Sequence, residues 1–148
     1  MKKFASILLL LCAFVSLTYL VSRGIDSYQE SANLEKHEAG MKLYEQRCAT
    51  CHQSNGEGVK GLYPPLQSSD FLQENKHRII NVLLQGISGE ITVNGEVYNG
   101  VMHPVPVSDQ EIADILNYVS ARFGNGEMTF AKEEIEVLRE LHSSHSSN

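Results

Sequence analysis

Residues 48–52 read Cys48-Ala49-Thr50-Cys51-His52, which places two thiols two residues apart and an imidazole directly after the second. The only other cysteine of the 148 residues is Cys12. Two intervening residues make roughly one helical turn, so both sulfurs and the imidazole can act on a single ligand. Three kinds of site use this spacing: a covalent porphyrin attachment, a zinc site and a redox-active dithiol.

The attachment of haem c needs three groups, and this pentapeptide supplies all of them. Two cysteine sulfurs form thioether bonds with the porphyrin vinyl groups, and a histidine binds the iron from one face. Cys48 and Cys51 are therefore the candidate attachment residues, and His52 is the candidate iron ligand. A covalently held cofactor is retained outside the cell and adds buried apolar surface to a small core. One covalently attached haem c is our leading hypothesis.

The zinc and dithiol alternatives each lack part of their usual setting. A structural zinc ion takes four ligands in a tetrahedron, so a second pair is needed, and the paired candidates are His142 and His145 near the C-terminus. A thioredoxin-like dithiol follows a strand of a βαβ unit, whereas the residues before Cys48 have a helical pattern. Both alternatives stay open, but the sequence favours haem.

The ligand on the second face of the iron decides what the site does, because a filled site passes electrons and an open site binds oxygen or peroxide. Met102 is our candidate, since it lies in a loop predicted over residues 98–104 that contains glycine and proline. His103 is the alternative and would lower the potential by giving two imidazole ligands. Met41 and Met128 are competitors that lack a comparable setting.

The first half of the chain after residue 31 predicts two helices around a long loop. Apolar residues at helical spacing predict a helix over residues 32–47 that runs into the cysteine motif. Glycines and prolines predict a loop over residues 53–69. Helix-start residues at Ser69-Asp70 and Asn75 predict a second helix, which Gly86 ends.

The second half predicts a hairpin and two more helices. Asn94-Gly95 between short β-prone runs is typical of a tight hairpin. Ser108 with Glu111 forms a capping box for a helix to about Phe123. An amphipathic helix follows Thr129, and the Ser- and His-rich residues 142–148 predict a disordered tail. We therefore expect an all-α fold of four to five helices around one haem, with a small hairpin before the loop that carries Met102.

The N-terminus predicts export from the cytoplasm. Lys2 and Lys3 precede an uncharged, mostly apolar run over residues 4–22. Because a bilayer-spanning helix takes roughly 20 apolar residues and the core of a signal peptide about 7 to 15, we favour an uncleaved anchor over a signal peptide cleaved after Gly24. Cys12 lies inside this run. The predicted organisation is a signal or anchor over residues 1–24, a tether over 25–30, a domain over 31–141 and the tail over 142–148.

The charge of the predicted exported part argues against two classes of partner. Beyond Arg23 the chain holds all 18 acidic residues but only nine of its 12 lysines and arginines. Such an acidic surface disfavours nucleic acid and anionic lipid as partners of the domain, and it suits a basic docking surface on another protein.

Several motifs occur together in a set order that is far more specific than the cysteine motif alone. They are Gly40 and Tyr44, Cys48-Ala49-Thr50-Cys51-His52, Gly56 and Gly58, Leu62-Tyr63-Pro64-Pro65-Leu66, Val93-Asn94-Gly95, Tyr98-Asn99-Gly100-Val101-Met102, and Ser108-Asp109-Gln110-Glu111-Ile112-Ala113. In this order they resemble the small bacterial c-type cytochromes that carry one haem and have the all-helical class I fold. The resemblance runs from about residue 39 to residue 139.

This resemblance implies a role for each matching residue. Cys48 and Cys51 would form the thioethers, and His52 and Met102 would be the axial ligands. The carbonyl of Pro64 would accept a hydrogen bond from the far nitrogen of His52, which fixes the ring and makes it more basic. Tyr98 and Asn99 belong to the same motif as Met102 and are further candidate haem contacts.

The resemblance also implies that the first helix crosses the helix after Ser108. Gly40 would allow the close approach beside Tyr44, against Ile115 and Tyr118. In such cytochromes a proline commonly follows the distal methionine at once, whereas here His103 intervenes before Pro104.

We expect a carrier of single electrons rather than an enzyme. Its partners would be redox proteins, such as a respiratory oxidase, reductase or dehydrogenase, together with the inner membrane through the N-terminal segment. The expected location is the periplasmic side of the cytoplasmic membrane, either anchored or soluble after cleavage. The alternatives are a haem subunit of a larger oxidoreductase and, less favoured, a peroxidase or gas sensor that uses His103.

Overall fold

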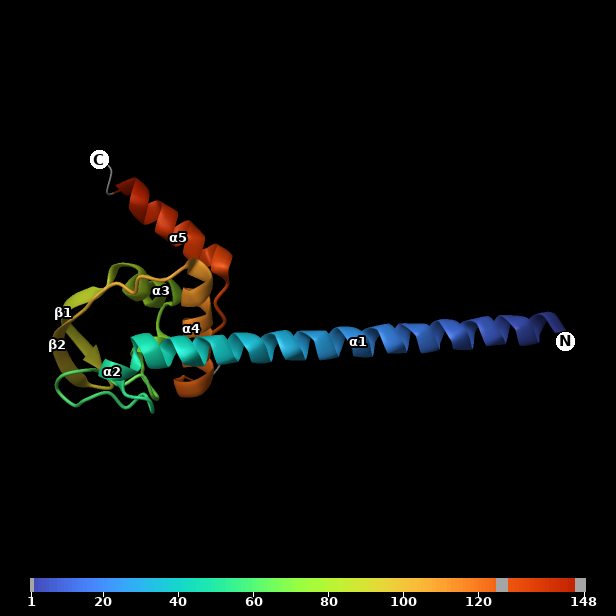
Figure 1. Ribbon diagram of the computed structural model, residues 1–148, viewed down its shortest axis with the longest axis horizontal. Helices are drawn as coiled ribbons and strands as arrows, with labels where there is room; N and C mark the ends of the chain where they lie inside the picture. Colours follow the sequence, from blue (N-terminus) through green and yellow to red (C-terminus); the bar gives the residue numbers. More distant parts are fainter. Residues whose placement is uncertain (1, 125–127, 146–148) are drawn as a thin grey trace. The chain divides into compact units, whose positions relative to one another are not determined.

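The N-terminal helix α1 runs without a break from Lys2 to Arg47 (Figure 1). The computed structural model describes residues 2–124 and 128–145, without the side chains of residues 2–11, 13, 24–32 and 145. The chain forms two units, residues 1–36 and residues 37–148. The stretch 25–30, predicted as a tether, belongs to the helix α1, and the predicted domain over residues 31–141 stays a prediction.

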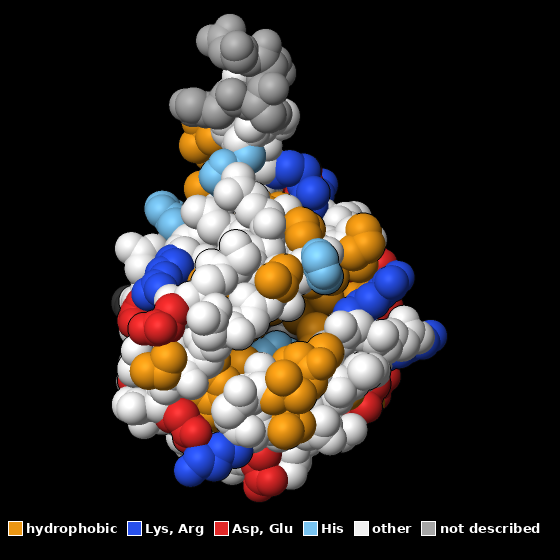
Figure 2. All heavy atoms as spheres, turned by 90° about the vertical axis from the view of Figure 1, so that its left-hand side faces the viewer, with side chains coloured by type: hydrophobic (Ala, Val, Ile, Leu, Met, Phe, Trp, Pro, Cys, Tyr) orange, Lys and Arg blue, Asp and Glu red, His pale blue; other side chains and the backbone are white. Residues whose placement is uncertain are grey.

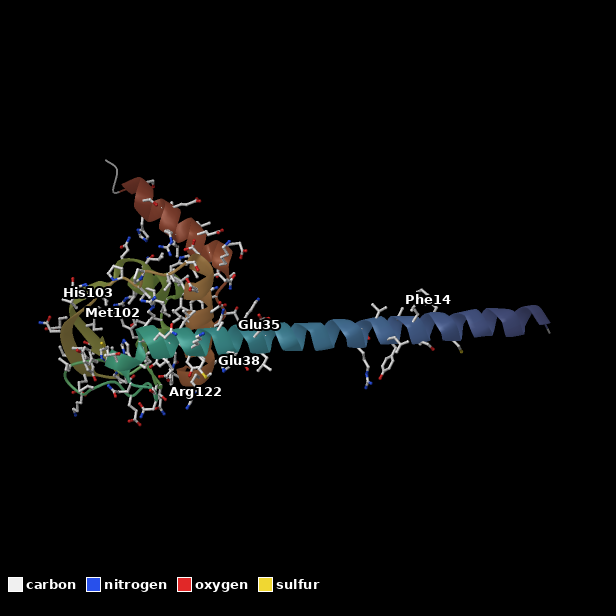
Figure 3. The ribbon with its side chains drawn as sticks, in the orientation of Figure 1. Phe14, Glu35, Glu38, Met102, His103 and Arg122 are labelled. Carbon is white, nitrogen blue, oxygen red and sulfur yellow. The ribbon has the colours of Figure 1, made fainter. Side chains whose placement is uncertain are left out.

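In the first unit, the described part of α1 carries exposed apolar side chains, among them Phe14, Leu17 and Leu20. Phe14 projects from the helix and is 66% exposed (Figure 3). Among the residues whose side chains the structure describes, no helix is both long and apolar enough to span a bilayer. The signal or anchor over residues 1–24 stays a prediction.

In the second unit, a short helix lies within the cysteine motif, and a 3₁₀ helix precedes the predicted second helix. Helix α2 spans Ala49–His52, and the 3₁₀ helix η1 spans Phe71–Gln73. Helix α3 spans Lys76–Gln85, where the Asn75 side chain accepts hydrogen bonds from the N–H groups of His77 and Arg78. The helix ends at Gly86, which has a φ of 77°. The start and the end of α3 are thus confirmed.

The predicted hairpin is confirmed but is longer than expected. Strand β1 (Ile87–Val93) pairs in antiparallel register with β2 (Glu96–Met102), from Val93↔Glu96 to Ile87↔Met102. At the turn, Asn94 and Gly95 have φ values of 52° and 78°, the left-handed conformation that a two-residue hairpin turn needs. The prediction of a loop over residues 98–104 is therefore wrong for its first five residues, because backbone pairing continues through Met102.

The tip of the hairpin is tied to the start of η1 by two reciprocal hydrogen bonds. The N–H of Asp70 donates to the side-chain oxygen of Asn94 at 3.0 Å, and the N–H of Asn94 donates to the carboxylate of Asp70 at 2.9 Å. The hairpin is therefore held at both ends, by α3 at its base and by Asp70 at its tip.

Two helices complete the unit. Helix α4 (Asp109–Phe123) starts with the predicted capping box, in which Ser108 and Glu111 bond each other reciprocally. Helix α5 spans Lys132–His145, so the predicted disordered tail is wrong for residues 142–145. His142 contributes to this continuation, since its Nε2 lies 2.8 Å from Oδ1 of Asn81 on α3. Residues 146–148 lie outside the described residues.

The core lies where the C-terminal part of α1 crosses α4 (Figure 1). A Cβ atom on Gly40 would stand 2.2 Å from the carbonyl oxygen of Asp114, so only glycine allows this approach. Tyr44 is fully buried beside Tyr118, with ring centroids 5.5 Å apart. Ile115 is also buried, and each such side chain stabilises the fold by about 1.5–3 kcal/mol. The helix crossing that the resemblance implies is thus present, and it places the end of α1 beside the cysteine motif.

Candidate haem-binding site

The cysteine motif forms a single helical turn at the end of α1. The N–H of His52 donates to the carbonyl of Cys48 at 2.9 Å, and the N–H of Cys48 donates to the carbonyl of Tyr44 at 2.8 Å. The chain leaves the helix at Gln53, whose φ of 63° is held in part by a 2.6 Å hydrogen bond from the Tyr44 hydroxyl to its carbonyl. Cys48 and Cys51 are both half-buried free thiols on this turn. The turn therefore presents both thiols and the imidazole together.

His52 is buried and held in one orientation. Its side chain is 8% exposed, and Nδ1 lies 2.9 Å from the carbonyl oxygen of Pro64. Because a carbonyl only accepts, Nδ1 is the protonated nitrogen, and Nε2 carries the lone pair that a metal needs. Burial lowers the pKa of His52, against the opposing effect of the bond to Pro64. The neutral imidazole, which is the metal-binding form, is thereby favoured.

The loop that carries Pro64 depends on Gly58. This glycine has a φ of 64°, and a Cβ on it would stand 2.4 Å from the carbonyl oxygen of Tyr63 and 2.7 Å from that of Pro64. Its N–H donates to the carbonyl of His52 at 2.9 Å. Gly58 thus allows the loop that carries Pro64 to pack closely against the His52 turn. The sequence motif did not reveal this role.

The structure gives no support to the zinc and dithiol alternatives. Burial, and to a smaller extent the nearby Cys51, raises the pKa of Cys48 to about 11, whereas the nucleophilic thiol of a redox dithiol has a lowered pKa. Among the described side chains, no group of three or more His, Cys, Asp or Glu residues is placed to hold a metal ion. His142 is engaged with Asn81, and the side chain of His145 lies outside the described residues.

Met102 is the last residue of β2 and is half-buried against the same core cluster as Cys48. His103 follows it and is exposed (Figure 3). The pairing of Met102 with Ile87 fixes its main chain in the register of the hairpin. A rigid strand rather than a free loop therefore presents this thioether.

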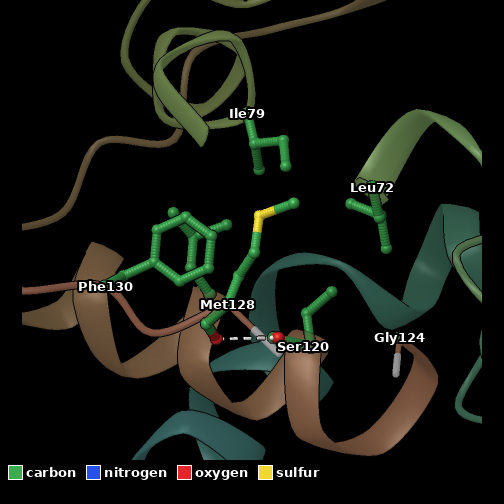
Figure 4. Close-up of a pocket in the computed structure, with 8 residues that line it drawn as sticks. Leu72, Ile79, Ser120, Gly124, Met128 and Phe130 are labelled. Atoms are coloured by element: carbon green, nitrogen blue, oxygen red, sulfur yellow. Dashed lines mark hydrogen bonds between the residues drawn. The ribbon is translucent and has the colours of Figure 1, made fainter. Parts of the chain in front are cut away.

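The two competing methionines are placed elsewhere. Met41 lies on α1 and is 44% exposed. Met128 packs in a small pocket between Leu72 of η1, Ile79 of α3 and Phe130, and its carbonyl accepts a 2.9 Å hydrogen bond from the Ser120 hydroxyl (Figure 4). The side chain of Met128 therefore packs in the core, and Met102 stays the favoured ligand.

The hairpin face that carries Met102 has room for a flat group. Along this face the paired residues are Ile87 with Met102, then Gly89 with Gly100, then Ile91 with Tyr98. A Cβ on Gly89 would meet nothing within 4 Å, and one on Gly100 would meet only the carbonyl oxygen of Leu62, at 3.9 Å. A stretch without side chains therefore lies between the thioether of Met102 and the buried ring of Tyr98.

The molecular surface has an apolar hollow on the side of α2 and the hairpin. On the side where α2, β1 and β2 lie, hydrophobic side chains surround a hollow that has a histidine side chain at its floor (Figure 2). Leu62, in the loop after α2, is an exposed hydrophobic residue. Val97 and Val101 of β2 are exposed too, but they lie on the face of the hairpin that carries Asn99, opposite Met102. An apolar hollow with an imidazole at its floor suits the binding of a haem.

One predicted haem contact is not brought to the site. Asn99 pairs with Glu90 and is exposed, so its side chain lies on the opposite face of the hairpin from Tyr98 and Met102. The strict alternation of side chains along a strand separates it from its neighbours. Treating residues 98–102 as a loop obscured that alternation.

The fold and the site define a helical domain built to hold a c-type haem. Comparison with known proteins agrees, because a family model described as Cytochrome c matches residues 37–122. The chain is 41% identical over 110 residues to cytochrome c-552 of Thermus thermophilus, an alignment that covers 68% of this chain and 83% of that protein. The chain therefore belongs to the cytochrome c family, whose members carry covalently bound haem c and transfer electrons.

Two further relatives are subunits of larger enzymes. The chain is 34% identical over 120 residues to the fructose dehydrogenase cytochrome subunit of Gluconobacter japonicus, covering 77% of this chain and 24% of that protein. It is 31% identical over 124 residues to the cytochrome c subunit of the quinone alcohol dehydrogenase of Gluconobacter oxydans, covering 78% of this chain and 26% of that protein. The expected fold class, cofactor and electron-transfer function are thereby confirmed.

Proposed function

We propose that this protein is an exported one-electron carrier in which Cys48 and Cys51 hold the haem, and His52 and Met102 are its axial ligands. The observation that supports this most directly is the 2.9 Å contact between Nδ1 of His52 and the carbonyl oxygen of Pro64. His52 lies on the same helical turn as both thiols. A buried, oriented imidazole next to two half-buried thiols is what covalent haem attachment needs.

The residues around the site would keep its geometry unchanged while an electron enters or leaves. Pro64 holds the imidazole plane, and the paired strands hold the main chain of Met102. When bound, the haem supplies an iron that alternates between ferric and ferrous states. A thioether opposite a histidine favours the ferrous state, so we expect a more positive potential than two histidines would give.

We propose that the chain carries electrons and makes or breaks no substrate bond. His103 is exposed and directly follows Met102, so it is the residue that a peroxidase or gas sensor would use. Carbon monoxide added to the reduced protein separates these functions. A carrier with both ligands in place leaves the spectrum unchanged, whereas an open iron shifts it at once.

A second candidate is a fixed haem subunit of a larger oxidoreductase. This candidate is favoured by the similarity to two relatives that are named as cytochrome subunits of dehydrogenases. Purification from solubilised membranes distinguishes the two, because a fixed subunit elutes with a larger enzyme and a free carrier elutes alone. A basic docking surface on the partner would suit the excess of acidic residues.

Export follows from the proposed site and from the N-terminal sequence, since bacterial c-type cytochromes typically act in the periplasm. We propose that residues 1–24 direct this export and, if retained, anchor the domain to the membrane. The mass of the mature protein and its distribution between the membrane and soluble fractions decide between anchor and signal peptide.

The decisive experiment is an absorption spectrum of the purified protein, followed by extraction with acid and organic solvent. The pigment should stay with the chain, and Cys48 and Cys51 should not react with thiol reagents. The ferric form should show the weak near-infrared band of sulfur-to-iron ligation, and Met102→Ala should abolish that band. Extraction of the haem, or a band that survives the substitution, contradicts the proposal.

A further inference from the structure

The main chain of Met102 rests directly against Gly86 at the end of α3. A Cβ atom on Gly86 would stand 2.3 Å from the carbonyl oxygen of Met102 and 3.1 Å from the nitrogen of Pro104. Real Cβ atoms do not approach main-chain oxygens this closely, so the contact exists because residue 86 has no side chain. Its φ of 77° also suits glycine.

The same junction holds the chain on both sides of Met102. Before the turn into β1, Leu83 is buried, and its carbonyl accepts a 2.9 Å hydrogen bond from the N–H of Val105. Directly after Gly86, Ile87 pairs with Met102 itself. Because Leu83 belongs to the buried face of α3, these contacts fix the main chain of Met102 relative to the core of the domain.

We propose that Gly86 is a positioning residue that sets the distance of the Met102 thioether from the iron. This inference rests on the proposed function, in which Met102 is the axial ligand. A side chain at position 86 would meet main-chain atoms, which cannot rotate away, and the end of β2 would have to move. The thioether would then reach the iron less often, while the His52 side of the site stays unchanged.

The chain offers a matched control for this idea. Gly95, at the hairpin turn, has a φ of 78°, and a Cβ on it would meet nothing within 4 Å. Gly86→Ala and Gly95→Ala both place a Cβ on a residue with a φ near 78°, but only the first adds an atom against Met102. The comparison separates displacement of the ligand from general destabilisation.

The test uses the full-length protein with its haem attached. Gly86→Ala should lose the near-infrared band of the ferric form, and its reduced form should bind carbon monoxide. Gly95→Ala should keep the band and resist carbon monoxide, as the unsubstituted protein does. The inference is overturned if Gly86→Ala keeps as much of the band as Gly95→Ala.

Met102→Ala separates failure of this inference from failure of the proposed function. If the band survives Met102→Ala, the axial assignment is wrong and the role of Gly86 falls with it. If Met102→Ala loses the band but Gly86→Ala keeps it, the axial assignment stands and only the positioning role is wrong.

A second pair of variants applies if Gly86→Ala does not fold. Val105→Pro removes the N–H that bonds Leu83, whereas Val105→Ala keeps it. Val105→Pro should bind carbon monoxide several-fold faster than Val105→Ala, because the segment after Met102 is released from α3. Equal rates in the two variants overturn the inference.

Discussion

Gly40 lies against the main chain of Asp114, so closely that a Cβ on Gly40 would stand 2.2 Å from the Asp114 carbonyl oxygen. This contact sets the distance between α1 and α4, and through it the place of the cysteine motif at the end of α1. A main-chain oxygen cannot rotate away from an added methyl group, so the helices themselves must separate.

Gly40→Ala should therefore destabilise the domain by about 1–3 kcal/mol, the usual cost of overfilling a packed site. Thermal or denaturant unfolding of the haem-loaded protein measures the change. Lys42→Ala, at an exposed position of the same helix, is the control and should leave the stability nearly unchanged. A Gly40→Ala protein as stable as the control would show that the helices can separate freely.

Gly58→Ala should raise the redox potential. The added Cβ would stand 2.4 Å and 2.7 Å from the carbonyl oxygens of Tyr63 and Pro64, so the bond from His52 to Pro64 should lengthen. A less strongly bonded imidazole is a weaker donor to ferric iron, which favours the ferrous state. Redox titration measures the potential.

The control for this prediction is Gly61→Ala. Gly61 has a φ of 74° in the same loop, and a Cβ on it would meet nothing within 4 Å. If both variants have the potential of the unsubstituted protein, the bond to Pro64 does not tune the iron.

The capping box makes part of the stability of α4 dependent on pH. The N–H of Ser108 donates to the Glu111 carboxylate at 2.8 Å, and this bond, with that from the Ser108 hydroxyl, lowers the pKa of Glu111 below its ordinary value of 4.5. A lowered pKa in the folded state means a stabilisation that is present above pH 4.5 and is lost as the pH falls through the folded value.

Glu111→Gln should therefore reduce the loss of stability between neutral and acid pH. Denaturant unfolding at a series of pH values measures this slope. An unchanged slope in Glu111→Gln would show that the capping carboxylate does not contribute to the acid sensitivity.

Helix α5 lies beyond the family match, yet it belongs to the core. Ile135 is fully buried, whereas Val137, two residues on, is 55% exposed. Ile135→Ala should cost about 2–5 kcal/mol, as expected for a cavity in a packed core. Val137→Ala should change the stability by less than about 0.5 kcal/mol. Similar unfolding midpoints for the two variants would show that α5 is dispensable.

The sequence was sufficient wherever a local rule decides the structure. Asn75, the Ser108–Glu111 pair and the Asn94-Gly95 turn each satisfy backbone groups within a few residues, so α3, α4 and the hairpin could be predicted. The grouping of the two thiols and the imidazole could be predicted for the same reason, because all three lie on one helical turn.

Structure that depends on distant partners was missed. Gly100 and Pro104 on either side of Met102 suggested a loop, but pairing with β1 makes residues 98–102 part of a strand and turns Asn99 away from the site. Residues 142–145 were predicted to be disordered, but α5 packs against α3 and the helix continues. Gly86 was predicted only as a helix end, since its contact with Met102 is made by the fold.

The two bonds between Asp70 and Asn94 close the chain, 24 residues apart, into a ring that contains α3 and β1. When β2, which ends at Met102, opens by thermal motion, either these two hydrogen bonds break or α3 and β1 open together with it. Amide protons in α3 and in both strands should therefore exchange with solvent at one common rate, as a single cooperative unit. Under the proposed axial role of Met102, its sulfur would leave the iron only in those rare openings, and their frequency would set how often the second axial position becomes free.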